Sequence, residues 1–238
     1  MDVEGFLRAL PAAFADFPRS DVPLDRSLRA VLDAVDGLSE ENNLALIGLA
    51  AGHLEAGEAY VEAGTYRGRS LIAAALGGEA ECVGIDNFSF DDSDPAALQA
   101  NLDRFGVAGR ARMLDGDAAA VLRAAELPPV GVFFYDADHS TEATRAAFEA
   151  VIPHLAGQAL IVADNADWPK VRAAIDGFVD AHAEARLALR LAGREGGQPW
   201  WWDGVDLIAW NAYTGARPRK AGPGPAYSAS PRTASTSR

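Results

Sequence analysis

Several residue types are scarce in this sequence, and each shortage excludes a class of protein. One cysteine, Cys82, occurs among 238 residues, so we expect neither an internal disulfide nor a cysteine-rich metal site. Basic residues number 21 against 34 acidic ones, which gives a net charge of -13 at pH 7. Because phosphate binding needs lysine and arginine, this balance argues against nucleic acid as a partner.

Long apolar runs are also missing, because charged residues interrupt each run before it reaches the length of a membrane span. The first ten residues, MDVEGFLRAL, have early acids and no basic lead. That pattern is not typical of a signal peptide. We therefore expect a cytoplasmic protein with no membrane partner.

What the sequence contains is a regular alternation of short apolar runs with amphipathic segments. Strands are expected at residues 59–64, 81–86, 111–117, 130–136, 158–165, 186–193 and 204–211, and helices fill the gaps between the first six. This pattern predicts an α/β fold with a seven-stranded, mostly parallel sheet and helices on both faces. The last two strands have no helix between them, so they are expected to form an antiparallel hairpin. Their connection, REGGQPWWWDG, is expected to be irregular.

Composition divides the chain into three parts. Residues 1–38 carry apolar residues at helical spacing and are expected to form a helical appendage. Residues 39–214 form the main domain, which begins with a helix that Ser39 is expected to cap. Residues 215–238 are rich in proline, glycine, serine and threonine and contain five bases and no acid. This last part is expected to be a disordered basic tail.

Polar residues or glycine follow each of the first five strands. They are Glu62 and Gly64, Asp86, Gly116 and Asp117, Asp136 with Asp138 and His139, and Asp164 with Asn165. In an open parallel sheet, ligands bind beyond the carboxyl ends of the strands. The convergence of these residues therefore predicts an active site at that edge.

The loop VEAGTYRGRS, residues 61–70, follows the first strand and opens a helix. Its glycines allow the backbone to approach a ligand, but the loop lacks the GxGxxG pattern of dinucleotide-binding proteins. Glu62 would repel a pyrophosphate and suits a cationic ligand, and Asp86 stands where an acid binds ribose hydroxyls. S-adenosylmethionine has a ribose and a positive charge and lacks a phosphate.

The sequence here resembles the class I S-adenosylmethionine-dependent methyltransferases, over about residues 40–211. Glu62, Gly64, Gly68 and Ser70 are similar to their first motif, Asp86 to their ribose-binding acid, and LDGDAAAVL to the segment beside the adenine. The resemblance implies a Rossmann-like methyltransferase fold for residues 39–214. The cofactor-binding residues it implies are Glu62, Gly64, Gly68, Ser70, Asp86, Phe88, Gly116, Asp117 and Asp136.

The likeness is strongest to small bacterial O-methyltransferases of the catechol and macrolide-sugar types, whose fourth strand ends in a sequence like DADHS. Asp136, Asp164 and Asn165 form a set of oxygen donors, which suits Mg²⁺ and does not suit zinc. They match the positions that hold a divalent cation in those relatives. Asp167 is an alternative ligand, and Asp138 is expected to cap the turn or helix that follows it.

His139 follows the first of these ligands by three residues, at the position of a general base in the relatives. Histidine is suited to accept a proton near neutral pH, so we expect His139 to be the catalytic residue. The alternative is a histidine that only hydrogen-bonds the backbone where the next helix begins. The other three histidines, His53, His154 and His182, lie in helical segments and are expected to be structural.

The acceptor is expected to be a small hydroxylated molecule, a sugar or phenol of natural product biosynthesis, methylated with the help of Mg²⁺. Alternatives are a metal-independent methyltransferase, a nicotinamide-dependent oxidoreductase and a non-catalytic module with this fold. The run Trp200–Trp202 fits two roles, packing the N-terminal helices or a subunit interface, or covering the acceptor. The first of these roles is compatible with a homo-oligomer.

Overall fold

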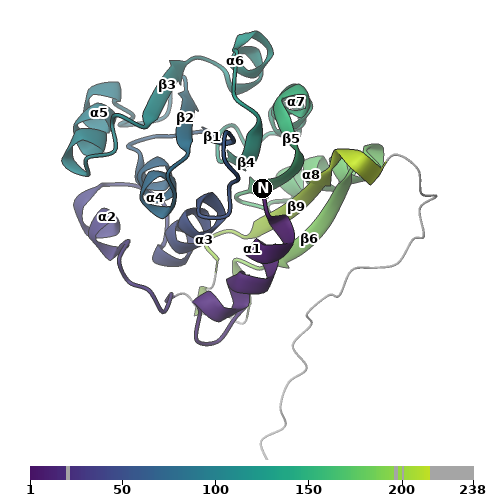
Figure 1. Ribbon diagram of the computed structural model, residues 1–238, viewed down its shortest axis with the longest axis horizontal. Coiled ribbons are helices and arrows are strands. Elements are labelled where there is room, and N and C mark those ends of the chain that lie inside the picture. The colour runs from purple at the N-terminus through teal and green to yellow at the C-terminus, as the bar shows by residue number, and fades with distance from the viewer. Residues whose placement is uncertain (20–21, 196–197, 200, 215–238) are drawn as a thin grey trace, which may run out of the picture.

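A seven-stranded sheet forms the centre of the computed structural model, which describes residues 1–19, 22–195, 198–199 and 201–214 (Figure 1). The strand order is β3-β2-β1-β4-β5-β9-β6. The strands are β1 (Ala59–Ala63), β2 (Glu81–Asp86), β3 (Ala111–Asp115), β4 (Val130–Tyr135), β5 (Leu155–Ala163), β6 (Ala185–Leu191) and β9 (Val205–Asn211). The predicted tail, residues 215–238, lies outside the described residues.

Strand direction follows the expected pattern. The pairs β1–β2, β1–β4, β2–β3 and β4–β5 are parallel, and β9 is antiparallel to both β5 and β6. The predicted fold class is confirmed, including the antiparallel pair at the end. The connection between β6 and β9 was expected to be irregular, and this expectation is wrong in part. It contains a two-stranded ladder of β7 (Arg194–Glu195) and β8 (Gln198–Pro199).

Helices cover both faces of the sheet (Figure 1). The helices of one face are α1 (Val3–Ala9), α2 (Arg29–Ala34), α3 (Glu41–Ala51), α4 (Arg69–Gly77) and α5 (Pro95–Arg104), and those of the other are α6 (Ala118–Ala124), α7 (Thr141–Val151) and α8 (Pro169–Ala181). Short 3-10 turns are η1 (Leu10–Ala13), η2 (Ile152–His154) and η3 (Ala212–Thr214). Each face has its own apolar core because successive strand residues point to opposite sides.

The N-terminal helices share the core of the first face. Val3, Phe6 and Leu10 are buried there, and Val31 of α2 is fully buried in the same cluster. Burying these side chains gives residues 1–38 a fixed place against the sheet.

Trp201 connects this N-terminal segment to the loop before β9. Its side chain is fully buried, and its indole N–H donates a 2.6 Å hydrogen bond to the carbonyl of Pro18. Edge-on contacts join it to Phe14 and Phe17, with ring centroids 5.3 and 6.4 Å away. Trp201 therefore packs against the N-terminal segment, which is one of the two roles considered for the tryptophan run. Trp200 lies outside the described residues.

Most helix starts follow from local chemistry. Ser140 caps α7 by accepting from the N–H of Ala143, and Pro169 occupies the first turn of α8. The expected cap at Ser39 is wrong. The helix begins one residue later, after Glu40, and no side chain caps it.

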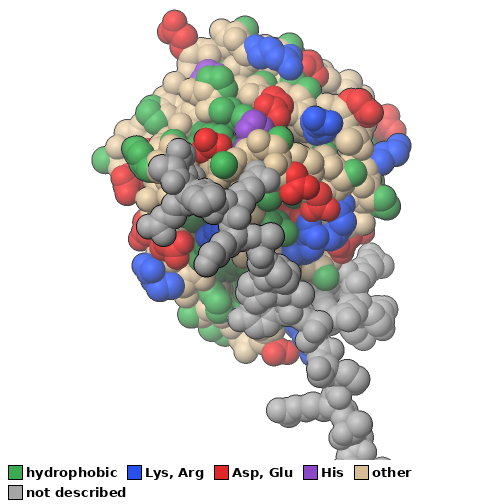
Figure 2. All heavy atoms as spheres, turned by 90° about the vertical axis from the view of Figure 1, so that its right-hand side faces the viewer, with side chains coloured by type: hydrophobic (Ala, Val, Ile, Leu, Met, Phe, Trp, Pro, Cys, Tyr) green, Lys and Arg blue, Asp and Glu red, His purple; other side chains and the backbone are tan. Residues whose placement is uncertain are grey.

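Surface character is mixed. On the face shown in Figure 2, apolar side chains are scattered among acidic and basic ones. Within the part of the chain that the structure describes, none of the helices has the length and apolar character that crossing a membrane requires.

Glu62 is a carboxylic acid at the centre of the sheet, on β1. It is fully buried, and Tyr60 donates a 2.6 Å hydrogen bond to its Oε2 while Oε1 has no partner. Burial raises the pKa of Glu62 to about 8, against hydrogen bonds from Tyr60 and Ser70 that lower it. The folded protein therefore holds this proton up to about pH 8, whereas the unfolded chain loses it near pH 4.

This difference predicts a pH-dependent effect of Glu62→Gln on stability. Between about pH 4.5 and the folded pKa of about 8, the unfolded wild type ionises and the folded one does not. As the pH rises through this range, the free energy of unfolding of the wild type therefore falls relative to that of the variant, by up to about 1.4 kcal/mol per pH unit. Above the range the difference between the two proteins stays constant. Thermal unfolding of both proteins from pH 5 to pH 9 measures it.

A matched control is Glu55→Gln, which changes an exposed carboxylate near the start of the same strand. The difference in stability between Glu55→Gln and the wild type is expected to stay small at every pH. A Glu62→Gln difference that does not change with pH would contradict the assignment of a proton to buried Glu62.

Candidate active site

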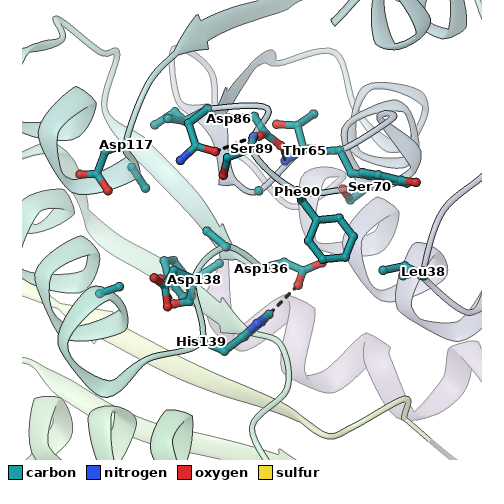
Figure 3. A pocket seen from close by; sticks show the side chains of 18 of the residues that line it. Leu38, Thr65, Ser70, Asp86, Ser89, Phe90, Asp117, Asp136, Asp138 and His139 are labelled. Atoms are coloured by element: carbon teal, nitrogen blue, oxygen red, sulfur yellow. Dashed lines mark hydrogen bonds and ion pairs between the residues drawn. The ribbon is translucent and has the colours of Figure 1, made fainter. Parts of the chain in front are cut away.

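A cleft of about 540 Å³ lies beyond the carboxyl ends of β1, β2, β3 and β4. Its size is that of a small-molecule site. It is lined by the loops that follow these four strands, by the first turn of α6, and by residues 36–39 of the N-terminal segment (Figure 3). Residues from four of the five predicted strand ends meet here, and those of the fifth, Asp164 and Asn165, do not line the cleft.

Asp86, the last residue of β2, organises the floor of the cleft. Its Oδ2 accepts hydrogen bonds from the N–H groups of Thr65 and Tyr66, both 2.7 Å long, and its Oδ1 accepts one of 2.7 Å from Phe88. A carboxylate has about four acceptor sites. Three are used by backbone donors, and the remaining one lies on Oδ1 at the wall of the cleft.

Gly64 allows the loops after β1 and β4 to lie side by side. Its φ is +88°, and a Cβ at this position would collide with the backbone carbonyl of Asp136. A larger residue would thus push the two loops apart and carry a strained backbone. The glycine sets the distance between the cofactor loop and the DADHS segment.

Arg69 holds the N-terminal wall of the cleft. Its guanidinium donates hydrogen bonds to four backbone carbonyls, those of Val35 (2.5 Å), Gly37 (2.7 Å), Ser39 (3.0 Å) and Leu32 (3.1 Å). These bonds fix the segment that runs from α2 into α3. No local sequence pattern indicates this role, because the partners lie 30 to 37 residues away along the chain.

Arg67, two residues earlier, joins the two walls of the cleft. Its Nη1 lies 2.9 Å from Oδ2 of Asp36, while Nε and Nη2 donate to the carbonyl of Asp92 at 3.1 and 3.0 Å. One guanidinium therefore connects the N-terminal segment with the loop after β2. The sequence analysis missed this contact too, and the only signal for it was the pair of arginines within the glycine loop.

The aromatic residue on the loop after β2 is Phe90, not the expected Phe88. Phe88 packs against the core of the first face and does not line the cleft. Phe90 is 61% exposed, lines the cleft and contacts Tyr66 edge-on at 5.8 Å. In Figure 3 its ring lies over the cavity, between Leu38 and Ser89. The N–H of Phe88 donates to Asp86, and Phe88 has a left-handed backbone conformation with a φ of +49°.

Gly116 and Asp117 form the wall beyond β3. Asp117 is the N-cap of α6 and accepts a 2.9 Å hydrogen bond from the N–H of Ala120. Gly116 has a φ of +143° and lets the chain turn into that helix. Both residues line the cleft, at the place expected for the adenine.

Asp136 and His139 lie together where the cleft meets the end of β4 (Figure 3). Nε2 of His139 lies 3.4 Å from Oδ1 of Asp136. Burial raises the pKa of Asp136, and the neighbouring histidine opposes that rise. Asp138 also lines the cleft, and its Oδ1 accepts a 2.7 Å hydrogen bond from the N–H of Ser140, so it is a turn-capping residue, as expected.

Asp164 and Asn165 follow β5, next to the end of β4. They are 6% and 5% exposed and do not line the cleft. Oδ1 of Asp164 is buried without a partner, and burial, with the charge of Asp136, raises the pKa of Asp164 well above its usual range. Asn165 has a φ of +52°, a left-handed conformation that asparagine tolerates better than most residues.

The cleft thus collects most of the residues expected to bind a cofactor, together with the expected base. Those that line it are Gly64, Ser70, Asp86, Gly116, Asp117, Asp136 and His139, and those that do not are Glu62, Gly68, Phe88, Asp164 and Asn165. Gly68 begins α4 with a φ of +93°, so its role is in the turn. Glu62 is buried within β1, so it has no direct contact with the cleft.

The remaining histidines lie outside the cleft. His53 contacts the carbonyl of Leu49, His154 that of Leu122, and His182 contacts the carboxylate of Glu149. Of the four histidines, His139 alone lines the cleft.

Comparison with known proteins gives a family match and several similar folds. Residues 61–166 match the family model described as a methyltransferase domain. No curated protein matches the chain. Similar solved structures include an O-methyltransferase from Bacillus cereus in complex with S-adenosylhomocysteine, with 17% identity, a TM-score of 0.59, and coverage of 85% of this chain and 100% of that one.

Two more similar structures come from natural product pathways. The O-methyltransferase TomG from Streptomyces achromogenes, involved in tomaymycin synthesis and bound to S-adenosylmethionine, is 20% identical, with a TM-score of 0.60 and coverage of 80% of this chain and 92% of that one. The TDP-rhamnose 3'-O-methyltransferase of calicheamicin biosynthesis is 19% identical, with a TM-score of 0.54 and coverage of 87% and 92%. At these identities the likeness is one of fold.

The family match covers the part of the chain that carries the site. It begins in β1, before the glycine loop, includes Asp86 and the DADHS segment, and ends at Ala166, just after Asn165. The sheet order and the cleft agree with this match. Residues 61–166 are therefore similar to a methyltransferase domain, and the fold of the chain is that of solved O-methyltransferases.

Proposed function

We propose that the protein transfers the methyl group of S-adenosylmethionine to a hydroxyl of a small molecule. The observation that carries this proposal is that His139 lines the same cleft as Asp86 and Asp117. One cavity thus combines acids suited to the ribose and adenine with a side chain that can accept a proton. The bound cofactor supplies the sulfonium methyl group, and the protein brings the acceptor oxygen in line with it.

The cofactor assignment rests on the charges around the cleft. The free acceptor site of Asp86 takes a ribose hydroxyl, and Asp117 lies beside the adenine. A cation is favoured near Asp136 and Asp164, because burial raises the pKa of both carboxylates and a positive charge would allow them to ionise. The same carboxylates would repel the two phosphates of a nicotinamide dinucleotide.

His139 is the general base of the proposal. Oδ1 of Asp136 lies 3.4 Å from Nε2 of His139, and its negative charge would stabilise the imidazolium that forms when the acceptor hydroxyl loses its proton.

Mg²⁺ is the second expected ligand, and the residues present fit it in donor chemistry. Asp164 has a buried oxygen without a partner, Asp136 is the neighbouring carboxylate, and Asn165 adds an amide oxygen. Within the described residues no three His, Cys, Asp or Glu side chains converge on one point. The site would thus need water and acceptor oxygens to complete it. Bound there, Mg²⁺ would lower the pKa of the acceptor hydroxyl.

The proposed acceptor is a small sugar or phenol of natural product biosynthesis. Support comes from two similar folds whose names refer to tomaymycin synthesis and to calicheamicin biosynthesis. The net charge of -13 makes a nucleic acid acceptor unfavourable and agrees with a cytoplasmic small-molecule enzyme.

Asp86→Ala is expected to weaken binding of S-adenosylhomocysteine by at least about tenfold. The change removes the ribose acceptor and releases three backbone donors, and hydrogen bonds to a charged group contribute about 1.5–3 kcal/mol each. Calorimetric titration measures the affinity. Asp91→Ala, which removes an exposed carboxylate from the same loop, is the matched control and should bind like the wild type. Equal affinity in Asp86→Ala would refute the assignment.

His139→Ala is expected to lower turnover by about a hundredfold or more while the affinity for S-adenosylhomocysteine stays within about twofold. Release of S-adenosylhomocysteine from S-adenosylmethionine is followed with catechol and with methyl α-L-rhamnopyranoside as acceptors. His182→Ala, which removes a histidine outside the cleft, is the control. Full turnover in His139→Ala would show that another group is the base.

Mg²⁺ is expected to bind chelator-treated protein saturated with S-adenosylhomocysteine at one site and to raise its melting temperature. Asp164→Asn should abolish both effects because it removes a charge while keeping the side-chain shape. Asp180→Asn, on the exposed face of α8, should retain them. Absence of binding to the wild type, together with turnover that survives chelation, would support the metal-independent alternative.

A further inference from the structure

A loop over the cofactor cleft, residues 87–93, is held in place by few contacts. Asn87, Ser89 and Phe90 of this loop line the cleft, and the ring of Phe90 lies over the cavity (Figure 3). The backbone hydrogen bonds of the loop join neighbours within it or reach back to the end of β2. Among the residues that the structure describes, Arg67 alone joins it by hydrogen bonds to another part of the chain. Such a loop opens at a low cost in free energy.

Backbone strain is concentrated in this loop and in the glycine loop that contacts it. A left-handed conformation occurs at Phe88 and Asp92 of the first loop, with φ of +49° and +58°, and at Tyr66 of the second, with φ of +49°. Residues with a large side chain adopt this conformation at a cost, which contacts nearby must offset. The carbonyl of Asp92 is held by two hydrogen bonds from the guanidinium of Arg67. Release of that guanidinium would thus allow the strained loop to relax.

The guanidinium of Arg67 contacts three parts of the site. Its Nε and Nη2 donate to the carbonyl of Asp92 at 3.1 and 3.0 Å, and its Nη1 lies 2.9 Å from Oδ2 of Asp36. Its carbon lies 5.4 Å from the centre of the Tyr66 ring, and that ring contacts Phe90 edge-on with centroids 5.8 Å apart. Arg67 therefore holds the loop at Asp92 and, through Tyr66, at Phe90.

The ion pair between Arg67 and Asp36 is the weakest contact of this set. The side chain of Asp36 is 86% exposed, and that of Arg67 is 24% exposed. Ion pairs with an exposed partner contribute little to stability and are screened by salt. The wall that carries Asp36 is fixed independently, because Arg69 donates to four carbonyls of that segment. When the pair breaks, the guanidinium of Arg67 loses one of its two hydrogen-bonded partners, and the loop is the part that is able to move.

We propose that residues 87–93 are a lid over the bound cofactor and that Arg67 is its latch. While Arg67 is bonded to Asp36 and to the carbonyl of Asp92, Phe90 covers the cleft, and the product S-adenosylhomocysteine leaves only when the latch opens. The inference rests on the proposed function, which supplies the ligand, and adds to it the step that controls exchange of product for new cofactor. Lid opening, rather than chemistry, limits turnover in many enzymes.

A latch has a kinetic signature that a ligand-binding residue lacks. Loss of a direct contact with the ligand mainly raises the dissociation rate. Loss of a latch raises the association rate as well, because the free protein is then open for a larger fraction of the time. Salt gives a second signature, since it screens the exposed ion pair and so favours the open lid. S-adenosylhomocysteine is a zwitterion without net charge at neutral pH, so salt has little direct effect on its encounter with the protein.

The test measures the association and dissociation rates of S-adenosylhomocysteine on immobilised full-length protein by surface plasmon resonance. Wild type, Arg67→Met, Asp36→Asn and Asp33→Asn are compared at about 50 and about 500 mM NaCl, between which the range of charge interactions falls about threefold. Methionine keeps the unbranched stem of Arg67 but has no donor. Asp33 is the matched control, because it is an exposed carboxylate of the same N-terminal segment, pairs with Arg29 at 2.9 Å and does not line the cleft. Thermal unfolding verifies that each variant is folded.

At low salt both rates are expected to rise together, by about threefold or more in Arg67→Met and by about twofold or more in Asp36→Asn, with Kd within about threefold of the wild type. In the wild type, high salt should raise both rates by about twofold or more. Asp36→Asn should show no such response because its ion pair is already absent. Asp33→Asn should behave like the wild type.

Three results would overturn the lid. Wild-type rates in both Arg67→Met and Asp36→Asn would mean that the loop does not limit exchange. A raised dissociation rate with a wild-type association rate would make Arg67 a direct contact of the ligand. An equal response to salt in the wild type and in Asp36→Asn would show that the ion pair is no part of the latch. All three leave methyl transfer intact, whereas failure of S-adenosylhomocysteine to bind the wild type would contradict the proposed function itself.

Discussion

Crowding of carboxylates at one edge of the sheet is the constraint on which the site depends. Backbone N–H groups, rather than cations, satisfy most of them: Asp86 accepts three such bonds, and Asp117 and Asp138 accept one each. These bonds shape the loops that form the cleft. At this edge Oδ1 of Asp164 is left buried without a partner. A cationic ligand beside Asp136 and Asp164 would favour the ionised forms of both carboxylates.

Two of the basic residues that line the cleft are engaged by its own walls. Arg69 gives its hydrogen bonds to four backbone carbonyls of the N-terminal segment, and Arg67 divides its own between Asp36 and the carbonyl of Asp92. Both guanidinium groups thus position walls instead of forming an anion site. This use of arginine favours a sulfonium cofactor over a dinucleotide and explains how a loop with two arginines avoids binding phosphate.

The sequence was sufficient for the sheet and for the convergence of its strand ends, because apolar periodicity and glycine positions are local signals. It was sufficient as well for the cap at Ser140 and the turn at Asp138. It was not sufficient for Arg69, whose partners are 30 to 37 residues away, or for the place of Phe90, rather than Phe88, in the wall of the cleft. Side-chain direction in a loop follows from such contacts, and no periodic pattern encodes them.

The two halves of the site are built from different parts of the chain, with His139 at the border. The loops after β1, β2 and β3 and the N-terminal segment form the cofactor side. The loop after β5, held by backbone bonds to the segment before β9, forms the other side. The three hydrogen bonds that Asp86 accepts come from the loops after β1 and β2, so a change in the loop after β5 leaves these donors in place. A fold of this kind can therefore keep one methyl donor and vary the ring that receives the methyl group.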